Sequence, residues 1–389
     1  MTRGCTTSAW SCPAGRRSPR PCPRAPRSAC CTARSSARAA GSRCRPPAAW
    51  RTRWSTAGSR WTSTSPPGTR TPGDWLTYGD RTVPEKHYEP VRHYVGWLLG
   101  KLRDGIADDQ FGDWYPPRPG PTPRPPEGNT LVGTAYVIST LRDAVAVAEV
   151  VGDTAQATAW TTQAEQLTRR FNEVFLHGDA YRTDVPTGYR QTSNAVPLAF
   201  GLVPAGRTAA VAARLAAEVE ATRHLDTGAL GVGALPYALS DHGRAELAHL
   251  VLGQRDYPSY GYLRDLGATT FWESWEAGSR GHNDPTLSSP VSWLVERVVG
   301  VEPLAPGWAR FRVAPTPVLT SASATLDTVR GRVGVSWRRD GGTLVLDVEV
   351  PVNAVAEVVR PDGTRDLGSG RHRLTWRLGR YVTADAPAR

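Results

Sequence analysis

Glu273 is the residue of this sequence whose surroundings most favour chemistry. The aromatic residues close to it in a glycine-rich stretch are Trp272, Trp275, Tyr260 and Tyr262. Flat aromatic faces suit sugar rings, and a carboxylate among them is placed to act as a general acid or base. Spacing alone leaves a second interpretation equally open, a tryptophan-rich packing corner with a solvated glutamate. Glu276 is expected at the surface or behind the site.

Two further polar segments could line the same site. Asp113 lies beside Trp114 after a predicted helix and could hydrogen-bond substrate hydroxyls, although capping of the following turn is the favoured interpretation. In residues 279–285, His282 and Asp284 could also face the site, against the alternative of a short polar loop that enters a helix. The predicted substrate-binding residues are Asp113, Trp114, Tyr260, Trp272, Trp275, His282 and Asp284.

Several motifs of other chemistries are absent. The sequence contains no His-Glu-x-x-His, Cys-x-x-Cys, Gly-x-Ser-x-Gly or phosphate-loop pattern, and its Gly-x-Gly stretches do not join a strand to a helix. Metal, serine-nucleophile and nucleotide chemistry are therefore unsupported, and neither a metal nor a cofactor is predicted.

The elements that must position these residues begin after Asp74 as helices with short polar breaks. Apolar residues recur at three- and four-residue steps over residues 84–102 and 131–151, and again from Trp160 to Phe175. Gly152 and Asp153 supply a helix stop and a helix start, which predicts an antiparallel hairpin. Further helices are expected at 191–201, 206–221, 243–253 and 286–299, joined by loops such as 224–233 and 254–270.

From about Val301 the pattern changes to a period of two residues. Strands are predicted at 309–313, 322–327, 332–337, 343–350 and 354–359, with turns at Asp340-Gly341 and Asp362-Gly363. These strands predict a small antiparallel β-sandwich. The fold class is therefore mainly α with a β domain, divided into residues 1–73, 74–300 and 301–389.

Residues 1–72 differ sharply from the rest. They contain no Leu, Ile, Val, Phe, Tyr or acidic residue, but they carry 14 arginines and all six cysteines of the chain. Without those apolar residues the segment cannot bury enough surface to offset the entropy of ordering, so it is expected to be disordered. The net charge of +11 comes wholly from this segment, because the remainder has 33 basic and 36 acidic residues.

This segment allows three interpretations. It could be a basic arm that binds phosphate backbones, or a targeting peptide, although it has no apolar core of the kind that export signals carry. The favoured interpretation is a GC-rich gene read out of frame, because only nine residue types occur before Gly73. No nucleic-acid partner is therefore predicted. No run of 18 apolar residues occurs, so no membrane span is predicted, and a cytoplasmic location is expected.

Several ordered motifs from residue 131 onward resemble the catalytic domain of the bacterial α-L-rhamnosidases, glycoside hydrolase family 78. They are Leu-Val-Gly-Thr-Ala-Tyr (131–136), Gln-Thr-Ser-Asn-Ala (191–195), His-Leu-Asp-Thr-Gly (224–228), Tyr-Pro-Ser-Tyr-Gly (257–261) and Gly-Ala-Thr-Thr-Phe-Trp-Glu-Ser-Trp (267–275). Residues 306–315 resemble the entry to that family's C-terminal β-sandwich. The resemblance implies an (α/α)6 toroid, inverting hydrolysis of terminal α-L-rhamnosides, a rhamnose-containing substrate, and Glu273 as the general base.

The sequence departs from the family pattern in three respects. The family's general acid lies in an upstream Asp-Glu-Arg-x-x-Trp-x-Gly-Asp motif, and residues 1–73 contain no Glu. A closed toroid needs twelve helices, whereas about eight are predicted, so the toroid is expected to be incomplete. Asp284 stands where the family often has His. Impaired hydrolysis is therefore expected, with a non-catalytic sugar-binding remnant or another toroid glycosidase as alternatives.

Overall fold

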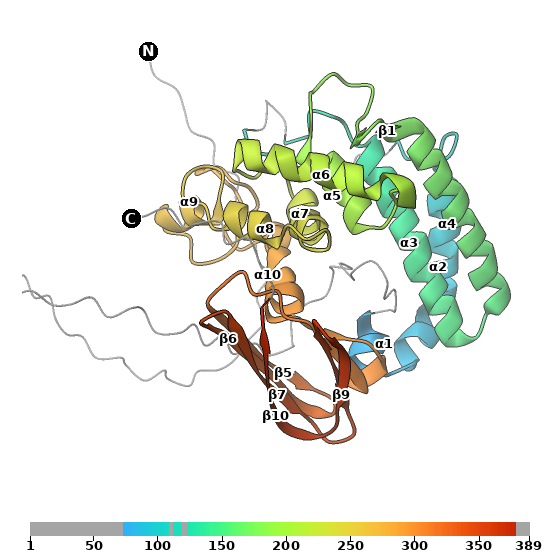
Figure 1. Cartoon of the computed structure of the whole chain (residues 1–389). Helices are drawn as coiled ribbons and strands as arrows, with labels where there is room; N and C mark the ends of the chain where they lie inside the picture. The colour runs from blue at the N-terminus through green and yellow to red at the C-terminus, as the bar shows by residue number, and fades with distance from the viewer. Residues whose placement is uncertain (1–72, 109–111, 119–122, 379–389) are drawn as a thin grey trace, which may run out of the picture. The chain divides into compact units, whose positions relative to one another are not determined.

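The computed structural model describes residues 73–108, 112–118 and 123–378. All of these residues belong to one compact unit, residues 52–389. Helices occupy the chain up to Val299 and strands follow, as Figure 1 shows by the change from blue through yellow to red. The predicted fold class, a mainly helical domain followed by a β-sandwich, is thereby confirmed. The expectation of disorder for residues 1–72 lies outside the described residues.

The helices form successive hairpins. In chain order they are α1 (Gly73–Tyr78), α2 (Thr82–Leu99), α3 (Thr130–Val151), α4 (Thr154–Phe175), α5 (Gln191–Ala199), α6 (Ala205–Thr222), α7 (Gly231–Ser240), α8 (Ala245–Leu252), α9 (Tyr260–Asp265) and α10 (Pro290–Trp293). Two residue pairs, β1 (Leu176–His177) and β2 (Ala180–Tyr181), make a small hairpin after α4. A 3₁₀ turn, η1 (Pro285–Leu287), precedes α10, and a π-helical segment, η2 (Leu294–Val299), continues it.

Buried and exposed helices alternate along the chain. Every residue of α5 is buried, as are the first nine residues of α7, whereas α4 and α6 bury one face only. The buried helices α3, α5 and α7 pack against one another in that order, and each also packs against the helix that follows it, α4, α6 or α8 (Figure 1). An inner layer of apolar helices is therefore covered by an outer layer of amphipathic ones.

The hairpin of α3 and α4 forms where the sequence predicts it. Gly152 adopts a left-handed conformation with φ of 90°, which glycine enters without steric cost, and it ends α3. The side chain of Asp153 then accepts a hydrogen bond from the backbone N–H of Gln156 and begins α4. The helix predictions at 84–102, 191–201, 206–221 and 243–253 are likewise confirmed to within three residues at each end.

Three helices were not predicted, and one was placed wrongly. The helix α7 is apolar on all sides and starts with Gly231 and Gly233, so it has no amphipathic pattern. Helices α1 and α9 have six residues each, too few for a periodic signal. The continuous helix expected at 286–299 begins only at Pro290, because Pro290 occupies the first helical position after a separate 3₁₀ turn.

Among the described residues, one helix, α3, is long and apolar enough to cross a membrane by length and composition alone. Of its most apolar stretch, 56% is buried inside the structure. It packs against α2, α4 and α5. A core helix of a helical domain has the same composition, because it is apolar all round.

The strands after the helices form two four-stranded sheets. Their bounds are β3 (Val301–Pro303), β4 (Arg310–Val313), β5 (Ser321–Thr328), β6 (Gly331–Asp340), β7 (Thr343–Val350), β8 (Val355–Arg360), β9 (Gly363–Leu367) and β10 (Gly370–Arg377), with a short 3₁₀ turn, η3 (Pro306–Trp308), between β3 and β4. One sheet has the order β10-β7-β6-β5 and the other β3-β4-β8-β9. The expected strands are all present, and β3, β9 and β10 were not predicted.

The sequence predicts an antiparallel sandwich, and this prediction is wrong for one pair of strands. Strand β4 pairs with β8 in parallel, with Phe311 opposite Ala356. The chain leaves β4, builds β5, β6 and β7 in the other sheet, and returns with β8 in the same direction. A crossover through a second sheet permits parallel pairing, which a tight turn between adjacent strands does not.

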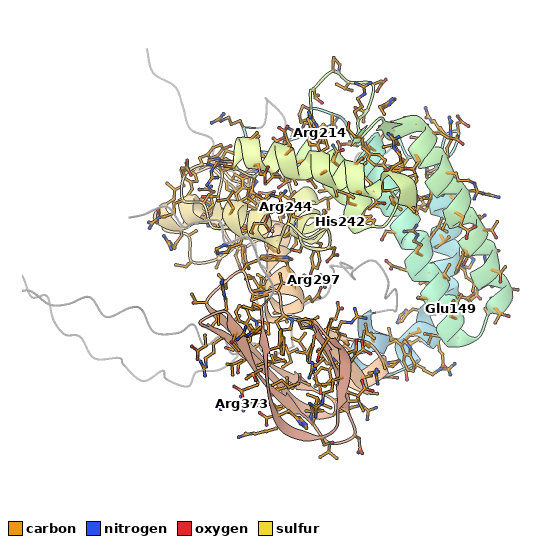
Figure 2. The ribbon with its side chains drawn as sticks, in the orientation of Figure 1. Glu149, Arg214, His242, Arg244, Arg297 and Arg373 are labelled. Atoms are coloured by element: carbon orange, nitrogen blue, oxygen red, sulfur yellow. The ribbon has the colours of Figure 1, made fainter. Side chains whose placement is uncertain are left out.

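The segment η2 at the end of the helical region is bonded both to helix α7 and to strands of the sandwich. Arg297 of η2, labelled in Figure 2, forms ion pairs with Asp241 at the end of α7 and with Glu302 of β3. The indole N–H of Trp337 on β6 donates a hydrogen bond of 2.9 Å to the carbonyl oxygen of Val298. These contacts join α7, η2 and the first strands of the sandwich.

Candidate active site

The segment that carries Glu273 is a backbone hairpin. The N–H of Glu273 donates to the carbonyl oxygen of Gly281 at 2.9 Å, and the N–H of Asp284 donates to that of Phe271 at 3.0 Å. A Cβ at Gly281 would lie 3.1 Å from the Glu273 Cβ, so the two arms are in close contact. The sequence analysis grouped residues 279–285 with Glu273 as parts of one site, and the hairpin does bring them together.

The carboxylate of Glu273 is held by a tyrosine from a distant segment. The hydroxyl of Tyr115 donates a hydrogen bond of 2.6 Å to Glu273 Oε1, although 158 residues separate the two. The guanidinium of Arg280 lies 4.0 Å from the same oxygen, and the Glu273 side chain remains 20% exposed. The hydrogen bond to Glu273, aided by burial, raises the pKa of Tyr115 above its ordinary value, so the phenol stays protonated as the donor.

Glu276 is bound in a second, similar contact. Its Oε1 accepts hydrogen bonds from the hydroxyl of Tyr257 at 2.6 Å and from the backbone N–H of Arg118 at 3.2 Å. The guanidinium of Arg118 also lies over the Tyr257 ring. Burial and the hydrogen bond to Glu276 raise the pKa of the Tyr257 hydroxyl, which therefore also acts as a neutral donor.

The predicted aromatic residues are largely buried, and one of them, Trp272 at 6% exposure, is covered by an exposed histidine. Trp275 is fully buried, with its indole N–H bonded to the carbonyl oxygen of Thr227, and Tyr260 packs edge-on against it. Trp272 instead stacks face to face on the exposed His282, with ring centroids 4.0 Å apart and planes within 5°. The plate formed by Trp272 and His282 lies on the hairpin that carries Glu273.

Asp113 precedes Tyr115 by two residues, and its carboxylate is surrounded by donors. It is completely buried. Its oxygens accept hydrogen bonds from the Thr192 hydroxyl and from the backbone N–H groups of Gly228, Leu230 and Gly231. The last two groups belong to the start of α7, so Asp113 caps this distant helix and not the turn that follows it in sequence. Burial raises the pKa of Asp113, and the four donors oppose that effect.

Trp114 and Asp284 are the remaining predicted residues. Trp114 is half-buried and meets the Tyr115 ring edge-on, with centroids 6.3 Å apart. Asp284 accepts hydrogen bonds from the backbone N–H and the hydroxyl of Thr286 and so caps the 3₁₀ turn η1. Its Oδ2 would lie 3.4 Å from a Cβ on Gly281.

An ion cluster of Arg190, Glu127 and Asp226 lies near Asp113 and was not predicted from the sequence. Arg190, at the start of α5, bonds Glu127 through Nε at 3.0 Å and both carboxylate oxygens of Asp226 through Nη1 at 2.6 Å. Glu127 is 2% exposed, and burial raises the pKa of both carboxyl groups while Arg190 lowers it. The sequence motif His-Leu-Asp-Thr-Gly was a signal for this cluster, because it contains Asp226. The next residue, Thr227, accepts the Trp275 hydrogen bond through its carbonyl oxygen.

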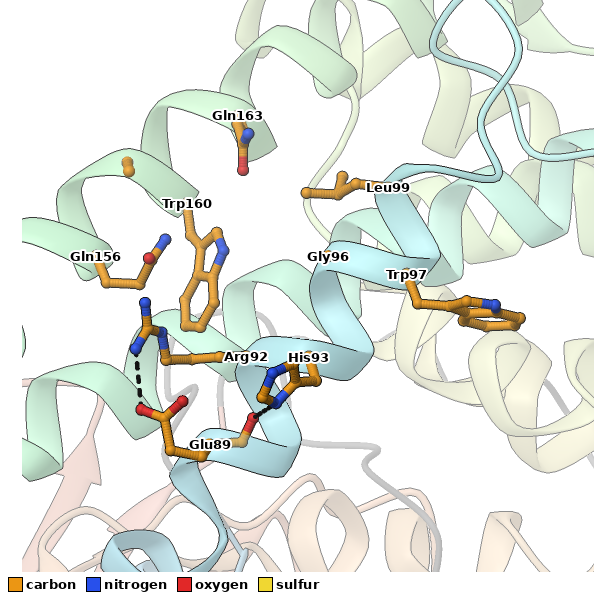
Figure 3. Close-up of a pocket in the computed structure, with 10 residues that line it drawn as sticks. Glu89, Arg92, His93, Gly96, Trp97, Leu99, Gln156, Trp160 and Gln163 are labelled. Carbon is orange, nitrogen blue, oxygen red and sulfur yellow. Dashed lines mark hydrogen bonds and ion pairs between the residues drawn. The ribbon is translucent and has the colours of Figure 1, made fainter.

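A separate cavity lies between α2 and α4. Its volume is about 450 Å³. Glu89, Arg92 and His93 from α2 and Gln156 and Trp160 from α4 are among the residues that line it (Figure 3). It shares no lining residue with the Glu273 site. Residues 73–108, 112–118 and 123–378 contain no cluster of three His, Cys, Asp or Glu side chains arranged to hold a metal ion.

Comparison with known protein families places this geometry in context. The family model described as the bacterial alpha-L-rhamnosidase 6 hairpin glycosidase domain matches residues 35–298. The chain belongs to the bacterial α-L-rhamnosidase family. A second model, the C-terminal domain of bacterial α-L-rhamnosidases, matches residues 300–375 and covers the β-sandwich. The resemblance read from the ordered motifs is thereby confirmed.

Individual relatives carry the same name. An α-L-rhamnosidase of Formosa agariphila is 31% identical over 305 residues, which cover 74% of this chain and 33% of that protein. One of Streptomyces avermitilis is 30% identical over 336 residues and covers 77% and 31%. The chain thus spans about a third of the length of these α-L-rhamnosidases.

Solved structures show the same fold. The α-L-rhamnosidase of Dictyoglumus thermophilum matches with a TM-score of 0.72 and 28% identity, over 77% of this chain and 38% of that one. The Streptomyces avermitilis α-L-rhamnosidase, solved in complex with L-rhamnose, matches with a TM-score of 0.69 and 28% identity, over 78% and 32%.

Proposed function

We propose that this chain carries the general base and part of the sugar-binding surface of an inverting α-L-rhamnosidase. The single observation that supports this most is the Glu273 carboxylate, which is partly exposed, is held through one oxygen by Tyr115, and belongs to the hairpin that also carries the stacked pair of Trp272 and His282. The rhamnose complex of the Streptomyces avermitilis relative supports the choice of sugar.

In the proposed reaction Glu273 activates water. Its carboxylate removes a proton while the water oxygen attacks the anomeric carbon, and the bond from that carbon to the leaving oxygen breaks with inversion. Inversion requires a second carboxyl group roughly 6.5 to 9.5 Å away that protonates the leaving oxygen. Because residues 1–73 contain no Glu, the acid motif of the resembled family has no counterpart here. We therefore propose that the chain as written supplies the base half of the reaction only.

The other predicted residues receive different roles in this proposal. His282 and Trp114 contact the sugar, the buried Trp272 supports the His282 ring by stacking on it, and Asp284 fixes the turn η1 next to the hairpin. Trp275 and Tyr260 support the hairpin from below, because both are engaged with neighbouring residues. Asp113 supports α7 rather than a substrate hydroxyl, because four protein donors already surround its carboxylate.

The choice of leaving group in the substrate distinguishes the contribution of the general base from that of the general acid. A 2,4-dinitrophenyl α-L-rhamnoside releases a phenolate that needs no protonation, whereas an alkyl α-L-rhamnoside requires the acid. We expect the chain to hydrolyse the first substrate and to leave the second at the background rate. Glu273→Gln should lower the dinitrophenyl rate by roughly 10² to 10⁴-fold. Glu149→Gln, at an exposed carboxylate near the end of α3, is the matched control and should leave the rate unchanged.

Two further results bear on the proposal. Azide needs no general base, so it should restore turnover to Glu273→Gly and give the β-L-rhamnosyl azide. Failure of azide to restore turnover would remove the base assignment. Rhamnose binding by calorimetry without any hydrolysis of the dinitrophenyl substrate would instead support a sugar-binding remnant, and faster hydrolysis of fucosides or glucosides would indicate another toroid glycosidase.

A further inference from the structure

We propose that Tyr115 is a positioning residue that orients the Glu273 carboxylate. In the same proposal, residues 112–118 fix the positions of the Glu273 and Glu276 carboxylates relative to each other. This inference rests on the proposed function of Glu273 and adds to it a residue from a segment far away in the sequence.

The contacts of Glu273 fall on one side of its carboxylate. The hydrogen bond from Tyr115 and the approach of Arg280 both involve Oε1. Among the described residues, therefore, Oε2 is the oxygen left to face water. A general base must be held within hydrogen-bond reach of the proton that it removes. The single donor Tyr115 thus sets the orientation of the base.

The second contact of the segment follows three residues later. The backbone N–H of Arg118 donates to the hydroxyl of Tyr257 and to Oε1 of Glu276. Glu273 and Glu276 are themselves three residues apart, so residues 115 and 118 bind the two carboxylates in the same order. Two separate contacts fix the register of residues 112–118 against the hairpin.

The backbone at both contact points has an uncommon conformation. Tyr115 has φ of 58° and Arg118 has φ of 50°, in the left-handed region that non-glycine residues rarely adopt. Such residues persist where surrounding contacts determine them, and they are frequent at functional sites. The N–H of Tyr115 donates to the carbonyl oxygen of Pro123 at 2.8 Å, which helps to hold this turn.

Few charged groups compete with Tyr115 for Glu273. The described groups near its carboxylate are Tyr115 and Arg280, with Glu276 further along the same arm and Asp284 beyond Gly281 on the other. The Arg280 side chain is 84% exposed, and solvent screens its charge. Tyr115 is therefore the dominant contact, and its raised pKa agrees with a donor that remains neutral.

Kinetics on the dinitrophenyl substrate provide the first test. Tyr115→Phe should lower kcat about tenfold and leave KM within about twofold. Tyr94→Phe removes the same hydroxyl from an exposed tyrosine of α2 and should change neither quantity. A kcat within about twofold of the parent value, or a rise in KM as large as the fall in kcat, would overturn the proposal.

A second readout does not depend on hydrolysis. The difference in ultraviolet absorbance between the parent and Tyr115→Phe isolates the ionisation of Tyr115, and circular dichroism verifies that the fold persists at each pH. In a Glu273→Gln background the same difference should show Tyr115 ionising at lower pH. Equal ionisation in both backgrounds would overturn the proposal. If the ionisation shifts while no rhamnoside is hydrolysed, the proposed function fails and the pairing of Tyr115 with Glu273 stands.

Discussion

Asp113 Oδ1 accepts a hydrogen bond of 2.8 Å from the backbone N–H of Gly231, the first residue of α7. The two residues are 118 positions apart. Since Tyr115 follows Asp113 by two residues, the anchor of a buried inner helix and the donor to Glu273 belong to the same short segment. A substitution that disturbs the Asp113 anchor is therefore expected to affect the position of Tyr115 as well.

The first prediction concerns this anchor. Asp113→Asn replaces an acceptor by an amide N–H₂ group that faces backbone donors, and it removes the negative charge at the start of α7. We expect the free energy of unfolding to fall by about 2 to 3 kcal/mol. Urea denaturation measures this, with Asp184→Asn at an exposed position as the control. A loss below about 0.5 kcal/mol would show that the cap contributes little.

Gly228 is the subject of the second prediction. A Cβ at this position would lie 2.1 Å from the carbonyl oxygen of Trp114 and 2.6 Å from that of Asp113. Gly228→Ala must therefore displace backbone, and we expect a loss of about 1 to 3 kcal/mol in unfolding free energy together with weaker hydrolysis. Gly206→Ala, in α6 with no atom within 4 Å of the added carbon, should instead stabilise the protein slightly. Thermal unfolding of both variants compares the two outcomes.

Local features of this fold could be predicted from the sequence, whereas contacts between distant residues could not. The hairpin of α3 and α4 could be predicted, because its apolar repeat and the pair Gly152-Asp153 are local signals. Helix α7 could not, because a helix buried on every side has no polar face to create a pattern. Glu273 could be singled out from its aromatic neighbours, whereas Tyr115 could not be paired with it, because only the fold brings residues 158 positions apart into contact.

The third prediction concerns Arg190. Arg190→Met would leave Glu127 and Asp226 without their shared cation, and Glu127 is almost completely buried. We expect a loss of about 3 to 5 kcal/mol in unfolding free energy, because an unpaired buried charge is strongly unfavourable. Adding Glu127→Gln to Arg190→Met should recover part of it. Arg169→Met, at an exposed position of α4, is the control, and a similar loss there would contradict the argument.

A pH dependence is expected from Glu296. This half-buried carboxyl accepts a hydrogen bond of 2.6 Å from Tyr237, and burial raises its pKa to about 7 from an ordinary value of 4.5. Between these values the folded protein binds more protons than the unfolded one, so stability falls as the pH rises. Relative to Glu296→Gln, the parent should lose on the order of 3 kcal/mol between pH 4.5 and pH 7.5.

Urea denaturation of the parent and of Glu296→Gln at about pH 4.5 and pH 7.5 measures this difference directly. Because the Gln side chain does not titrate, other ionisable groups cancel in the comparison. A difference that is constant across the two pH values would show that Glu296 is ionised throughout.

The parallel pair of β4 and β8 determines the order in which the sandwich can be completed. Phe311 and Ala356 are partners in this pair, and the whole meander from β5 to β7 lies between them in the chain. During synthesis β4 emerges from the ribosome well before β8 exists, whereas β5, β6 and β7 can pair as soon as they appear, because local contacts form faster than distant ones. The sheet β10-β7-β6-β5 is therefore expected to begin first, and β4 to wait with an unpaired edge until β8 arrives.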